Sequence, residues 1–567
     1  MFCCHNWFGP DIWYHLFLGR EVWQARTFMP QDHLLIQARG FVDVYWFFQL
    51  VCYGLYRLGG IIAVSSGFAL AWVGILVFWA KITEITRFGA RGAWIALAAI
   101  LIFQLRFEPR PEIPSYLFLC LQLFWLTRWD AQEPLSTANW CGFILTEIAW
   151  ASCHGYFALG PALAALRCVC AGRDRVARKR YGGLSAALAF ASLLTPLGWK
   201  TWGFFFRLSG VFSGLGSAIQ EFKAPVGGYL DLWTVWLFWL GWASIAVLVI
   251  QQFRRREPDP FSVAAATLGL ALSAQAFRNI PLGVILSAPL LRQALGTPRW
   301  KKPSYADFLP GALALGLAVY AVTNGFYESL SSQSGFGIRL SEAAYPISFA
   351  DYYEKIPSLS SNPEPIFNAS GDGGYLEFRM PDRPWTGDSR FTDSEQTLEY
   401  FGAAKNTALF ERFRAAHALH AALLDVVYNH ELLSALLMLP EWKLAYADLH
   451  RAFIVDSGFL ARHPDVKQQL DLYGNEDLSR KIHGMAAIQW TDLTLHWGSR
   501  DLLLLQLKQL SQANHIPSFV LEFALKAAID KKDRLLFDAA RELRPKMLAL
   551  RLEDEQVVDS LLAQNTF

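Results

Sequence analysis

Residues 61–80, IIAVSSGFALAWVGILVFWA, are twenty consecutive residues without a charge. A straight helix needs about 20 apolar residues to cross a bilayer, so this run by itself predicts a membrane span. Nine further apolar runs follow, several of them shorter than that length: 92–107, 115–127, 138–152, 155–171, 183–198, 229–250, 260–276, 280–295 and 305–325. Together they predict an α-helical multi-pass membrane domain of about ten spans over residues 61–325.

The composition changes sharply near residue 325. Residues 1–325 hold 27 Lys+Arg and 16 Asp+Glu, whereas residues 326–567 hold 24 and 33, so the net charge changes from +11 to −9. The first part also holds 18 of the 22 Trp and all eight Cys, without paired CxxC spacing, which disfavours a zinc site. The chain therefore combines a basic membrane part with an acidic, water-facing part, and the acidic charge argues against nucleic acid as a partner.

The loop charges predict the orientation of the spans. If 61–80 runs inward, the loops on the cytoplasmic side carry 16 Lys+Arg, and the short loops on the opposite side carry 6. The positive-inside rule favours this orientation. It makes residues 1–60 an extracytoplasmic loop and places 326–567 outside the cytoplasm. Within the loop, residues 44–58, VYWFFQLVCYGLYRL, are apolar but short, which is typical of an interfacial helix lying on the membrane.

The first residues, MFCCHNWFGPD, contain neither a basic n-region nor an apolar h-region, so they do not form a signal peptide. An outer N-terminal loop nevertheless needs a segment that delivers it across the membrane. We expect a first transmembrane helix that is missing from this sequence; the alternative is that the span 61–80 itself carries the loop outward.

The water-facing part divides into two predicted domains. Residues 326–455 predict an extracytoplasmic α/β domain in which PEPIFNAS and GYLEFRM are strands around a GDGG turn, and EWKLAYADLHRAFIVD is a hairpin. In it, Asp372, Asp388 and Arg390 are interpreted as turn and packing residues. Residues 456–567 predict an α-helical domain whose amphipathic helices suit stacked pairs of the TPR type, without a 34-residue repeat, and the binding of a protein partner.

With this orientation, many ionisable residues next to the apolar runs share the outer face. They are Asp11, His15, Asp43, Arg106, Glu108, Arg110, Glu112, His154, Glu221, Arg278 and the amide Asn279. Structural roles are open for several of them, since His154 suits helix packing, Arg278 suits a headgroup anchor and Asp43 suits a helix cap. Ionisable groups at membrane depth are costly, however, and their gathering on one face indicates a site.

This set of side chains suits group transfer from a lipid-linked phosphate. A carboxylate can take a proton from an acceptor hydroxyl or hold a divalent cation. Arginine matches the oxygens of a phosphate. We therefore expect Asp11 to act as the catalytic residue, and the donor phosphate to be bound by His15, Arg110, Glu112, His154, Arg278 and Asn279.

Six stretches occur in the order seen in a large group of bacterial multi-spanning proteins: PDIWYHLFLGREVWQARTFMPQD, FVDVYWFFQLVCYGLYRLGG, FEPRPEIPSYLF, ASCHGYFALGPAL, LLTPLGWKTWGF and RNIPLGVILSAPLL. They resemble the GT-C superfamily of glycosyltransferases that use polyprenyl-phosphate sugars. The resemblance covers residues 9–295. It extends into 371–455, where GDGGYLEFRMPDRPWTGDSRF and EWKLAYADLHRAFIVD resemble the C-terminal α/β module of that group.

The resemblance implies a hexosyl- or pentosyltransferase of the bacterial plasma membrane, with Asp11 as base or metal contact and Asp43 as a second acid. It departs from the group at VDVYWFFQ, residues 42–49, where the usual His and Glu are replaced by Val44 and Tyr45, which argues against a metal. The leading hypothesis is transfer of a sugar from a polyprenyl-phosphate donor to an envelope acceptor on the non-cytoplasmic side. The alternatives are a non-catalytic envelope assembly or binding protein of the same fold and, less favoured, a transporter.

Overall fold

The computed structural model describes residues 7, 9–28, 43–206, 222–225, 233–255, 259–296, 308–325, 335–361, 363–390, 394–471, 490, 500–511, 516–548 and 552–563. The chain forms two compact units. The first unit comprises residues 1–31, 40–330 and 335–339, and the second comprises 32–39, 331–334 and 340–567. Each unit is described separately below.

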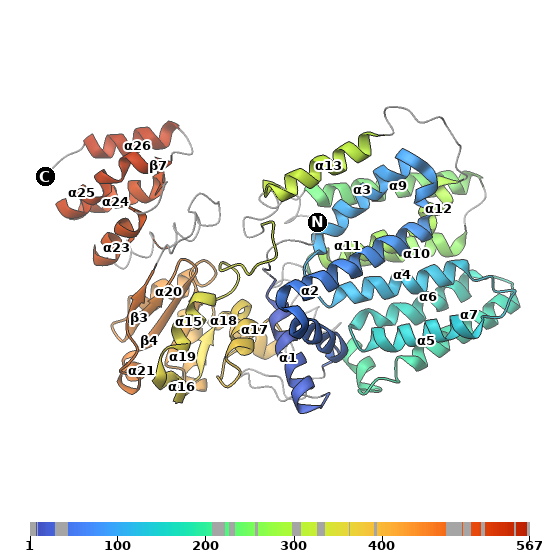
Figure 1. The fold of residues 1–567 in the computed structure, drawn as a ribbon, viewed down its shortest axis with the longest axis horizontal. Coiled ribbons are helices and arrows are strands. Elements are labelled where there is room, and N and C mark those ends of the chain that lie inside the picture. Colours follow the sequence, from blue (N-terminus) through green and yellow to red (C-terminus); the bar gives the residue numbers. More distant parts are fainter. Residues whose placement is uncertain are drawn as a thin grey trace. The chain divides into compact units, whose positions relative to one another are not determined.

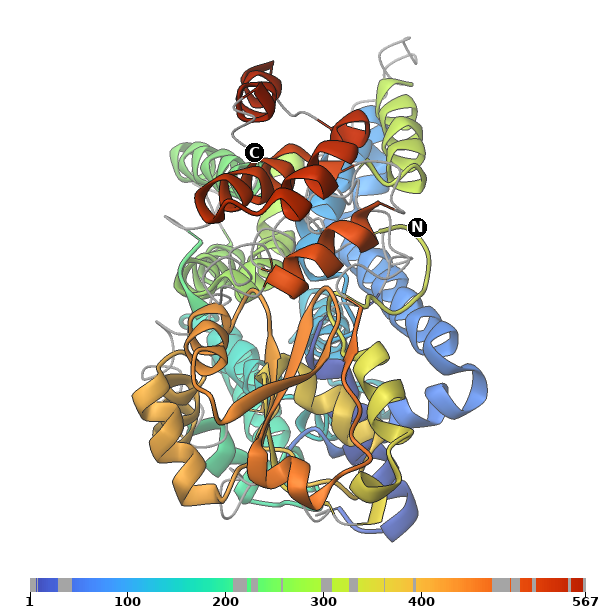
Figure 2. The same ribbon diagram turned by 90° about the vertical axis from the view of Figure 1, so that its left-hand side faces the viewer.

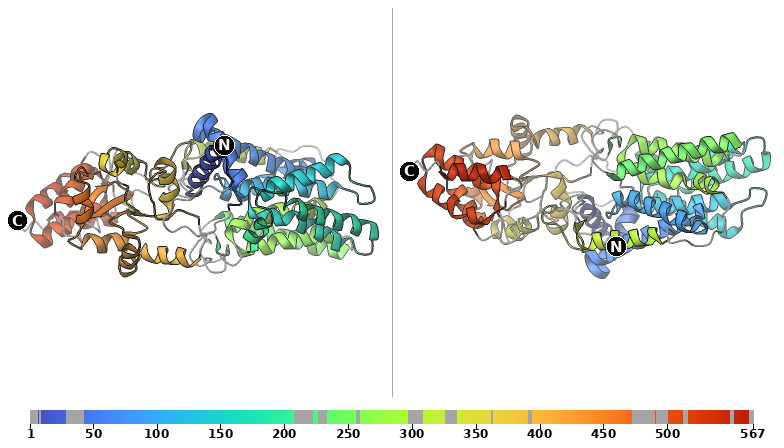
Figure 3. Two further views of the ribbon diagram at one scale, coloured as in Figure 1. Left: turned by 90° about the horizontal axis from the view of Figure 1, so that it is seen from below. Right: turned by 90° about the horizontal axis from the view of Figure 1, so that it is seen from above.

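The first unit is a bundle of helices (Figure 1, blue to green), and the two further views in Figure 3 show the same bundle. Its helices are α1 (Asp11–Ala25), α2 (Trp46–Thr83), α3 (Gly89–Phe103), α4 (Glu112–Arg128), α5 (Thr137–Ala151), α6 (Leu159–Cys170), α7 (Arg175–Ala191), α9 (Trp233–Arg255), α10 (Pro260–Gln275), α11 (Ile280–Leu286), α12 (Ala288–Leu295) and α13 (Leu309–Val322). Short 3₁₀ turns, among them η1 (Ile85–Phe88), η2 (Gln104–Arg106), η3 (Gly155–Ala158) and η5 (Phe277–Asn279), connect some of them.

The prediction of about ten membrane spans needs correction. Among the described residues, two helical segments are long and apolar enough to cross a membrane, Trp46–Thr83 and Ile85–Phe103. Five shorter apolar helices, of 10 to 17 residues, are Gly155–Cys170, Val235–Gln251, Pro260–Gln275, Phe277–Leu286 and Leu309–Val322. The apolar runs are divided into helices shorter than the roughly 20 residues of a straight span, as in α5, which begins at the Ser136 cap and has 15 residues, and α6, which follows the 3₁₀ turn η3 and has 12.

The label α2 covers two helices, because the backbone is not helical at Gly59 and Gly60. The first of them, residues 46–58, confirms a helix at the predicted 44–58, and the second contains the predicted span 61–80. Gly60 has a φ of 59°, which a glycine adopts without the steric cost of a side chain.

The second unit is built on a mixed five-stranded sheet, which faces the viewer in Figure 2. Its strands are β1 (Ile366–Asn368), β2 (Ala421–Asp425), β3 (Trp442–Ala447), β4 (Arg451–Asp456) and β5 (Gln469–Leu470), in the spatial order β1-β2-β4-β3-β5. The pairs β1–β2 and β3–β5 are parallel, whereas β2–β4 and β3–β4 are antiparallel. Strands β3 and β4 therefore confirm the predicted hairpin.

Helices cover this sheet and continue beyond it. They are α15 (Ile347–Glu354), α16 (Pro357–Ser361), α17 (Ser370–Arg379), α18 (Ser394–Ala403), α19 (Thr407–His417), α20 (His430–Leu437), α21 (Ser457–Arg462), α23 (Arg500–Leu510), α24 (Ser518–Lys531), α25 (Arg534–Glu542) and α26 (Leu552–Ala563). A 3₁₀ turn, η7 (Arg544–Lys546), follows α25. A short parallel pair, β6 (Ile516–Pro517) and β7 (Met547–Leu548), lies among the last helices. Strand β2 is almost entirely buried, and one apolar core runs from Phe367 through the sheet to Val558.

The prediction of a strand at GYLEFRM is wrong, because residues 370–379 form helix α17. GDGG lies inside the first turns of this helix and is not a turn between strands. A Cβ on Gly373 would lie 2.1 Å from the carbonyl oxygen of Gly387, so this glycine allows a close approach of two backbones.

Candidate functional site

The site begins where helix α1 begins. Asp11 is the first residue of α1, and a carboxylate is favoured in this position by the helix dipole. Its Oδ2 lies 3.4 Å from Nη1 of Arg110, whose Nε donates to Glu108 at 3.2 Å. A Cβ on Gly9 would lie 2.6 Å from the Glu108 carboxylate, so the glycine makes room for that acid. The structure thus joins residues 9–11 to the loop 106–112.

A second acid, Glu112, lies at the first position of α4 and is almost fully buried. Its Oε1 accepts hydrogen bonds from Arg106 at 2.8 Å and from Arg278 at 2.5 Å. Its Oε2 is buried and has no hydrogen-bond partner among the residues that the structure describes. Arg278 comes from η5, and its guanidinium also lies over the ring of Phe222, 4.9 Å from the ring centroid.

Two tyrosines hold His154 and Asn279 beside this ion-pair cluster. The hydroxyl of Tyr156 hydrogen-bonds Oδ1 of Asn279 at 2.5 Å, and its backbone N–H donates to Nδ1 of His154 at 3.2 Å. The hydroxyl of Tyr116, on α4, donates to the carbonyl of Arg278 at 3.1 Å. These contacts fix the backbone and side chains next to the guanidinium of Arg278.

His15 and Asp43 lie on the other side of Tyr45. The Gln49 amide lies 3.0 Å from Asp43 Oδ1 and 3.4 Å from His15 Nδ1, and all three side chains are buried. The ring of Tyr45 is 5.4 Å from that of His15 and 5.8 Å from that of His154, measured between centroids. His15 and Asp43 are therefore neighbours of the cluster through Tyr45. Asp43 also accepts from the Tyr45 N–H, just before α2 begins.

Burial and the neighbouring arginines together set the pKa values of Glu112 and His154. Both residues lie in loops or at helix ends, outside the predicted spans 115–127, 138–152 and 155–171. Burial would raise the pKa of Glu112, but the Arg278 and Arg106 guanidiniums outweigh burial and hold that pKa well below its usual range. Burial lowers the pKa of His154 to about 3, although the Glu112 carboxylate opposes this shift. At neutral pH Glu112 consequently stays charged between its two guanidiniums, close to the neutral imidazole of His154.

This arrangement does not fit a divalent cation. Each of the four acids is already engaged: Asp11 and Glu108 with Arg110, Glu112 with Arg106 and Arg278, and Asp43 with Gln49 and the Tyr45 N–H. A cation here would be repelled by the three guanidiniums that pair with Asp11, Glu108 and Glu112. Within the described ranges, no group of three or more His, Cys, Asp or Glu has the arrangement of a metal site.

Some residues of the cluster escaped the sequence reasoning. Tyr45, Tyr116, Tyr156 and Gln49 carry no charge, and in an aromatic-rich membrane sequence they look like interface residues. Glu221 lies outside the described residues.

Glu147 is a buried ionisable residue that the predicted set on the outer face does not include. It is fully buried in α5, inside the predicted span 138–152, and its Oε2 accepts from Nε2 of Gln122 on α4 at 2.8 Å. A single carboxyl in an otherwise apolar run changes the hydropathy little, which is why the sequence pattern did not single it out.

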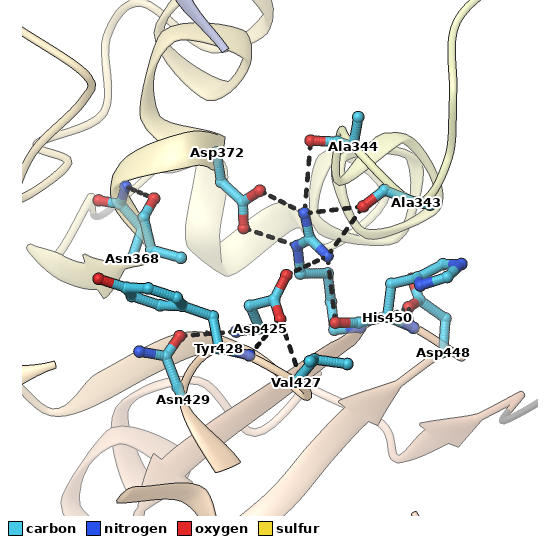
Figure 4. Close-up of polar contacts among 12 residues, drawn as sticks. Ala343, Ala344, Asn368, Asp372, Asp425, Val427, Tyr428, Asn429, Asp448 and His450 are labelled. Carbon is cyan, nitrogen blue, oxygen red and sulfur yellow. Dashed lines mark hydrogen bonds and ion pairs between the residues drawn. The ribbon is translucent and has the colours of Figure 1, made fainter. Parts of the chain in front are cut away.

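A separate polar cluster lies in the second unit and includes Asp372 (Figure 4). Arg451, on β4, binds both oxygens of Asp372 at 2.7 Å and one oxygen of Asp425 at 2.9 Å. Asp388 and Arg390 pair with each other, and Arg390 also pairs with the buried Glu377 at 2.9 Å. These contacts join α17 to the sheet and its loops, which is the packing role predicted for Asp372, Asp388 and Arg390.

Comparisons with known proteins give a likeness of fold. No protein-family model matches the chain, and no curated protein matches it either. The archaeal oligosaccharyltransferase AglB from Archaeoglobus fulgidus, solved with an inhibitory peptide and a dolichol-phosphate, is similar with a TM-score of 0.49 and 14% identity, over 74% of this chain and 66% of that one. The apo form of the Archaeoglobus fulgidus oligosaccharyltransferase gives a TM-score of 0.48 and 14% identity, over 75% and 67%.

These solved structures come from an archaeon and not from the bacterial group that the sequence resembles. The chain spans about two thirds of their length. Since sequence identity is 14% and the TM-scores are below 0.5, the function has to be argued from the residues of the site.

Proposed function

We propose that the chain is a membrane glycosyltransferase that moves a sugar from a polyprenyl-phosphate donor to an envelope acceptor on the non-cytoplasmic side. The observation that carries this proposal is the pair of ion-pair groups held by the loop 106–112, Asp11–Arg110–Glu108 and Arg106–Glu112–Arg278. It combines a proton acceptor with three guanidiniums, the pair of functions that transfer from a lipid phosphate requires.

Asp11 is the acid best suited to act as the base. Its side chain is 23% exposed, whereas that of Glu112 is 3% exposed and is held between two arginines. A base must reach the hydroxyl whose proton it takes, so the accessible carboxylate suits this role. Glu112 then acts as a positioning residue that keeps Arg106 and Arg278 in place.

The reaction needs few groups from the protein. The acceptor hydroxyl oxygen attacks the anomeric carbon of the sugar, the bond from that carbon to the phosphate oxygen breaks, and the hydroxyl proton passes to Asp11. The departing lipid phosphate gains one negative charge, which Arg278 and Arg110 stabilise. Asn279 and His154, both bound to Tyr156, supply polar groups beside Arg278, and His15 packs on the far side of Tyr45.

A membrane location is supported by the surfaces of the helices. In the 18-residue apolar windows of Trp46–Thr83 and Ile85–Phe103, 28% and 33% of the residues are buried. Leu70 on α2 is 71% exposed and Leu315 on α13 is 68% exposed. Large apolar faces left uncovered on long helices fit contact with lipid. The excess of Lys and Arg in alternate loops supports an outward orientation of residues 326–567.

A non-catalytic binding protein of the envelope is the second candidate. The observation in its favour is that every acid of the cluster is engaged and that Tyr45 occupies the position of an expected acid. The buried Glu147 inside a predicted span is the one observation that favours the transporter hypothesis. Among the described helices, however, its carboxyl accepts from the Gln122 amide and does not continue a chain of charged residues.

The proposal is tested with the purified full chain, labelled polyprenyl-phosphate sugars and an extract of envelope acceptors. The Asp11→Asn variant should lose at least a hundredfold in transfer rate while its melting temperature is kept, because the base is removed. Glu133→Gln, in an exposed loop, removes one carboxylate elsewhere in the same unit and should transfer normally. Binding of the donor without product by the wild-type chain would favour the binding protein, and equal transfer by Asp11→Asn would refute the assignment of the base.

A further inference from the structure

A second polar pocket lies in the first unit, at the helix ends opposite to the Glu112 cluster. It has a volume of about 540 Å³ and is lined by Ile82, Glu84, Arg87, Phe88, Thr127, Arg167, Asp259, Ser262, Pro289, Arg292, Gln293 and Gly296. Glu112 begins α4 and Thr127 lies at its far end, so a rise of 1.5 Å per residue separates the two places by roughly 22 Å. The pocket is thus distinct from the proposed active site.

Arginines outnumber acids around this pocket. Glu84 pairs with Arg87 at 2.7 Å and with Arg292 at 2.8 Å, and Arg128 approaches the same carboxylate to 3.9 Å. One carboxylate therefore faces three guanidiniums. Each guanidinium carries five N–H donors, so most of these donors are left over after the contacts with Glu84.

The other ion pair of the pocket, Arg167 with Asp259, is neutral as a pair and so leaves the excess of positive charge unchanged. Arg167 lies 3.3 Å from Asp259, and its guanidinium lies over the ring of Phe261 at 4.7 Å from the centroid. Three arginines and two acids line the pocket, Arg87, Arg167 and Arg292 with Glu84 and Asp259, so its lining carries a net charge of +1. The side chains of Arg87 and Arg292 are 64% and 44% exposed, so a ligand from solvent or from the membrane edge can reach them.

A buried acceptor in the pocket also lacks a protein partner. Gln293 donates from Nε2 to Ser262 Oγ at 3.2 Å, while its Oε1 is buried and has no hydrogen-bond partner among the described residues. Buried polar atoms are normally satisfied, so the pocket wall at Gln293 holds one acceptor that the described residues do not use.

We propose that this pocket binds a phosphate group, either as free phosphate or pyrophosphate or as the headgroup of an anionic phospholipid. Phosphate oxygens match the planar fork of arginine, and the negative charge of a phosphate offsets the positive surplus of the pocket. The loop charges put these helix ends on the cytoplasmic side, where both sources of phosphate are present. The pocket is independent of sugar transfer at the opposite end of the bundle.

The test measures binding to the full chain in a neutral detergent. One arm titrates inorganic pyrophosphate, and the other compares phosphatidylglycerol with phosphatidylcholine in nanodiscs. The Arg87→Gln/Arg292→Gln double variant should bind at least tenfold more weakly. The matched control, Arg175→Gln/Lys179→Gln, removes the same charge from exposed positions of α7 and should bind like the wild type.

A variant that is expected to bind the anion more tightly distinguishes a loss of binding from misfolding. Glu84→Gln removes the carboxylate that competes for three arginines, so it should bind the anion about threefold more tightly, a gain that a damaged fold cannot produce. Binding in the first arm identifies free phosphate, and selective binding in the second arm identifies a lipid headgroup. Failure of the wild type in both arms, or equal losses in the two double variants, would overturn the proposal.

Discussion

At the scale of single residues, both units bury carboxylates, and arginine decides which of them stay charged. Glu112 is held by two guanidiniums, whereas Asp372 shares one guanidinium, that of Arg451, with Asp425. Burial raises the pKa of Asp372 from 3.8 to about 6, with Arg451 opposing the shift. The two sites therefore respond differently to acid.

Asp372 predicts a pH dependence of stability in the second unit. Between about pH 4 and pH 6 the folded chain holds a proton that the unfolded chain has released, so the contribution of Asp372 to the free energy of unfolding is full below pH 4 and decreases as the pH rises through 6. A shift of this size corresponds to about 3 kcal/mol at most. Melting curves should therefore show that Asp372→Asn costs more stability at pH 4 than at pH 7. The exposed Asp382→Asn should show no such trend, and a cost for Asp372→Asn that grows with pH would contradict this reading.

The sequence alone indicates which charged residues belong to the candidate site, but it does not indicate the uncharged residues that contact them. Asp11, Arg110, Glu112 and Arg278 stand out because charge beside apolar runs is rare. Tyr45, Tyr116 and Tyr156 do not stand out, since a tyrosine hydroxyl adds no charge and its ring fits an apolar run. The pairing of Glu112 with Arg278 joins residues 166 positions apart, which no local pattern can reveal.

At the scale of elements, close contacts between helices explain several glycines. Gly160, near the start of α6, faces the hydrogen-bonded pair of Glu147 and Gln122, and a Cβ there would lie 2.3 Å from Glu147 Oε2. Gly183, on α7, has no atom within 4 Å of such a Cβ. The two glycines thus have opposite tolerance for a methyl group.

We expect Gly160→Ala to destabilise the first unit by about 1–3 kcal/mol, because the added methyl displaces a buried carboxyl. Gly183→Ala should be neutral or stabilising by up to about 1 kcal/mol, since alanine favours a helix. Thermal unfolding of the purified chain measures both. Equal melting temperatures for the two variants would show that α6 does not pack against Glu147 as described.

Elements were predicted with uneven success for physical reasons. The hairpin of β3 and β4 was recognised because its two apolar stretches flank a polar turn, ADLH at residues 447–450. Helix α17 was mistaken for a strand because its buried residues are nearly continuous and its glycines suggested a turn. The number of spans is overestimated because hydropathy does not locate helix ends, such as the Ser136 cap where α5 begins and the 3₁₀ turn η3 before α6.

At the scale of the whole molecule, the distribution of charge predicts how the chain is oriented. A basic first part and an acidic second part fit a membrane unit followed by a domain outside the cytoplasm. An alkaline phosphatase fused after Phe567 should therefore be active in cells, whereas the same reporter inserted after Arg173 should be inactive. An inactive C-terminal fusion together with an active one at residue 173 would reverse the orientation and place the Glu112 cluster on the cytoplasmic side.

The decisive measurement is the binding of a polyprenyl phosphate to the purified chain, compared with the neutral polyprenol of the same length. Arg278 lies 2.5 Å from Glu112 and is the guanidinium best placed to meet the lipid phosphate. We predict that the wild type prefers the phosphate over the alcohol, and that Arg278→Gln loses at least tenfold of this preference while Arg175→Gln keeps it. Equal binding of phosphate and alcohol by the wild type, or an unchanged preference in Arg278→Gln, would mean that the cluster of acids and arginines does not recognise a lipid phosphate.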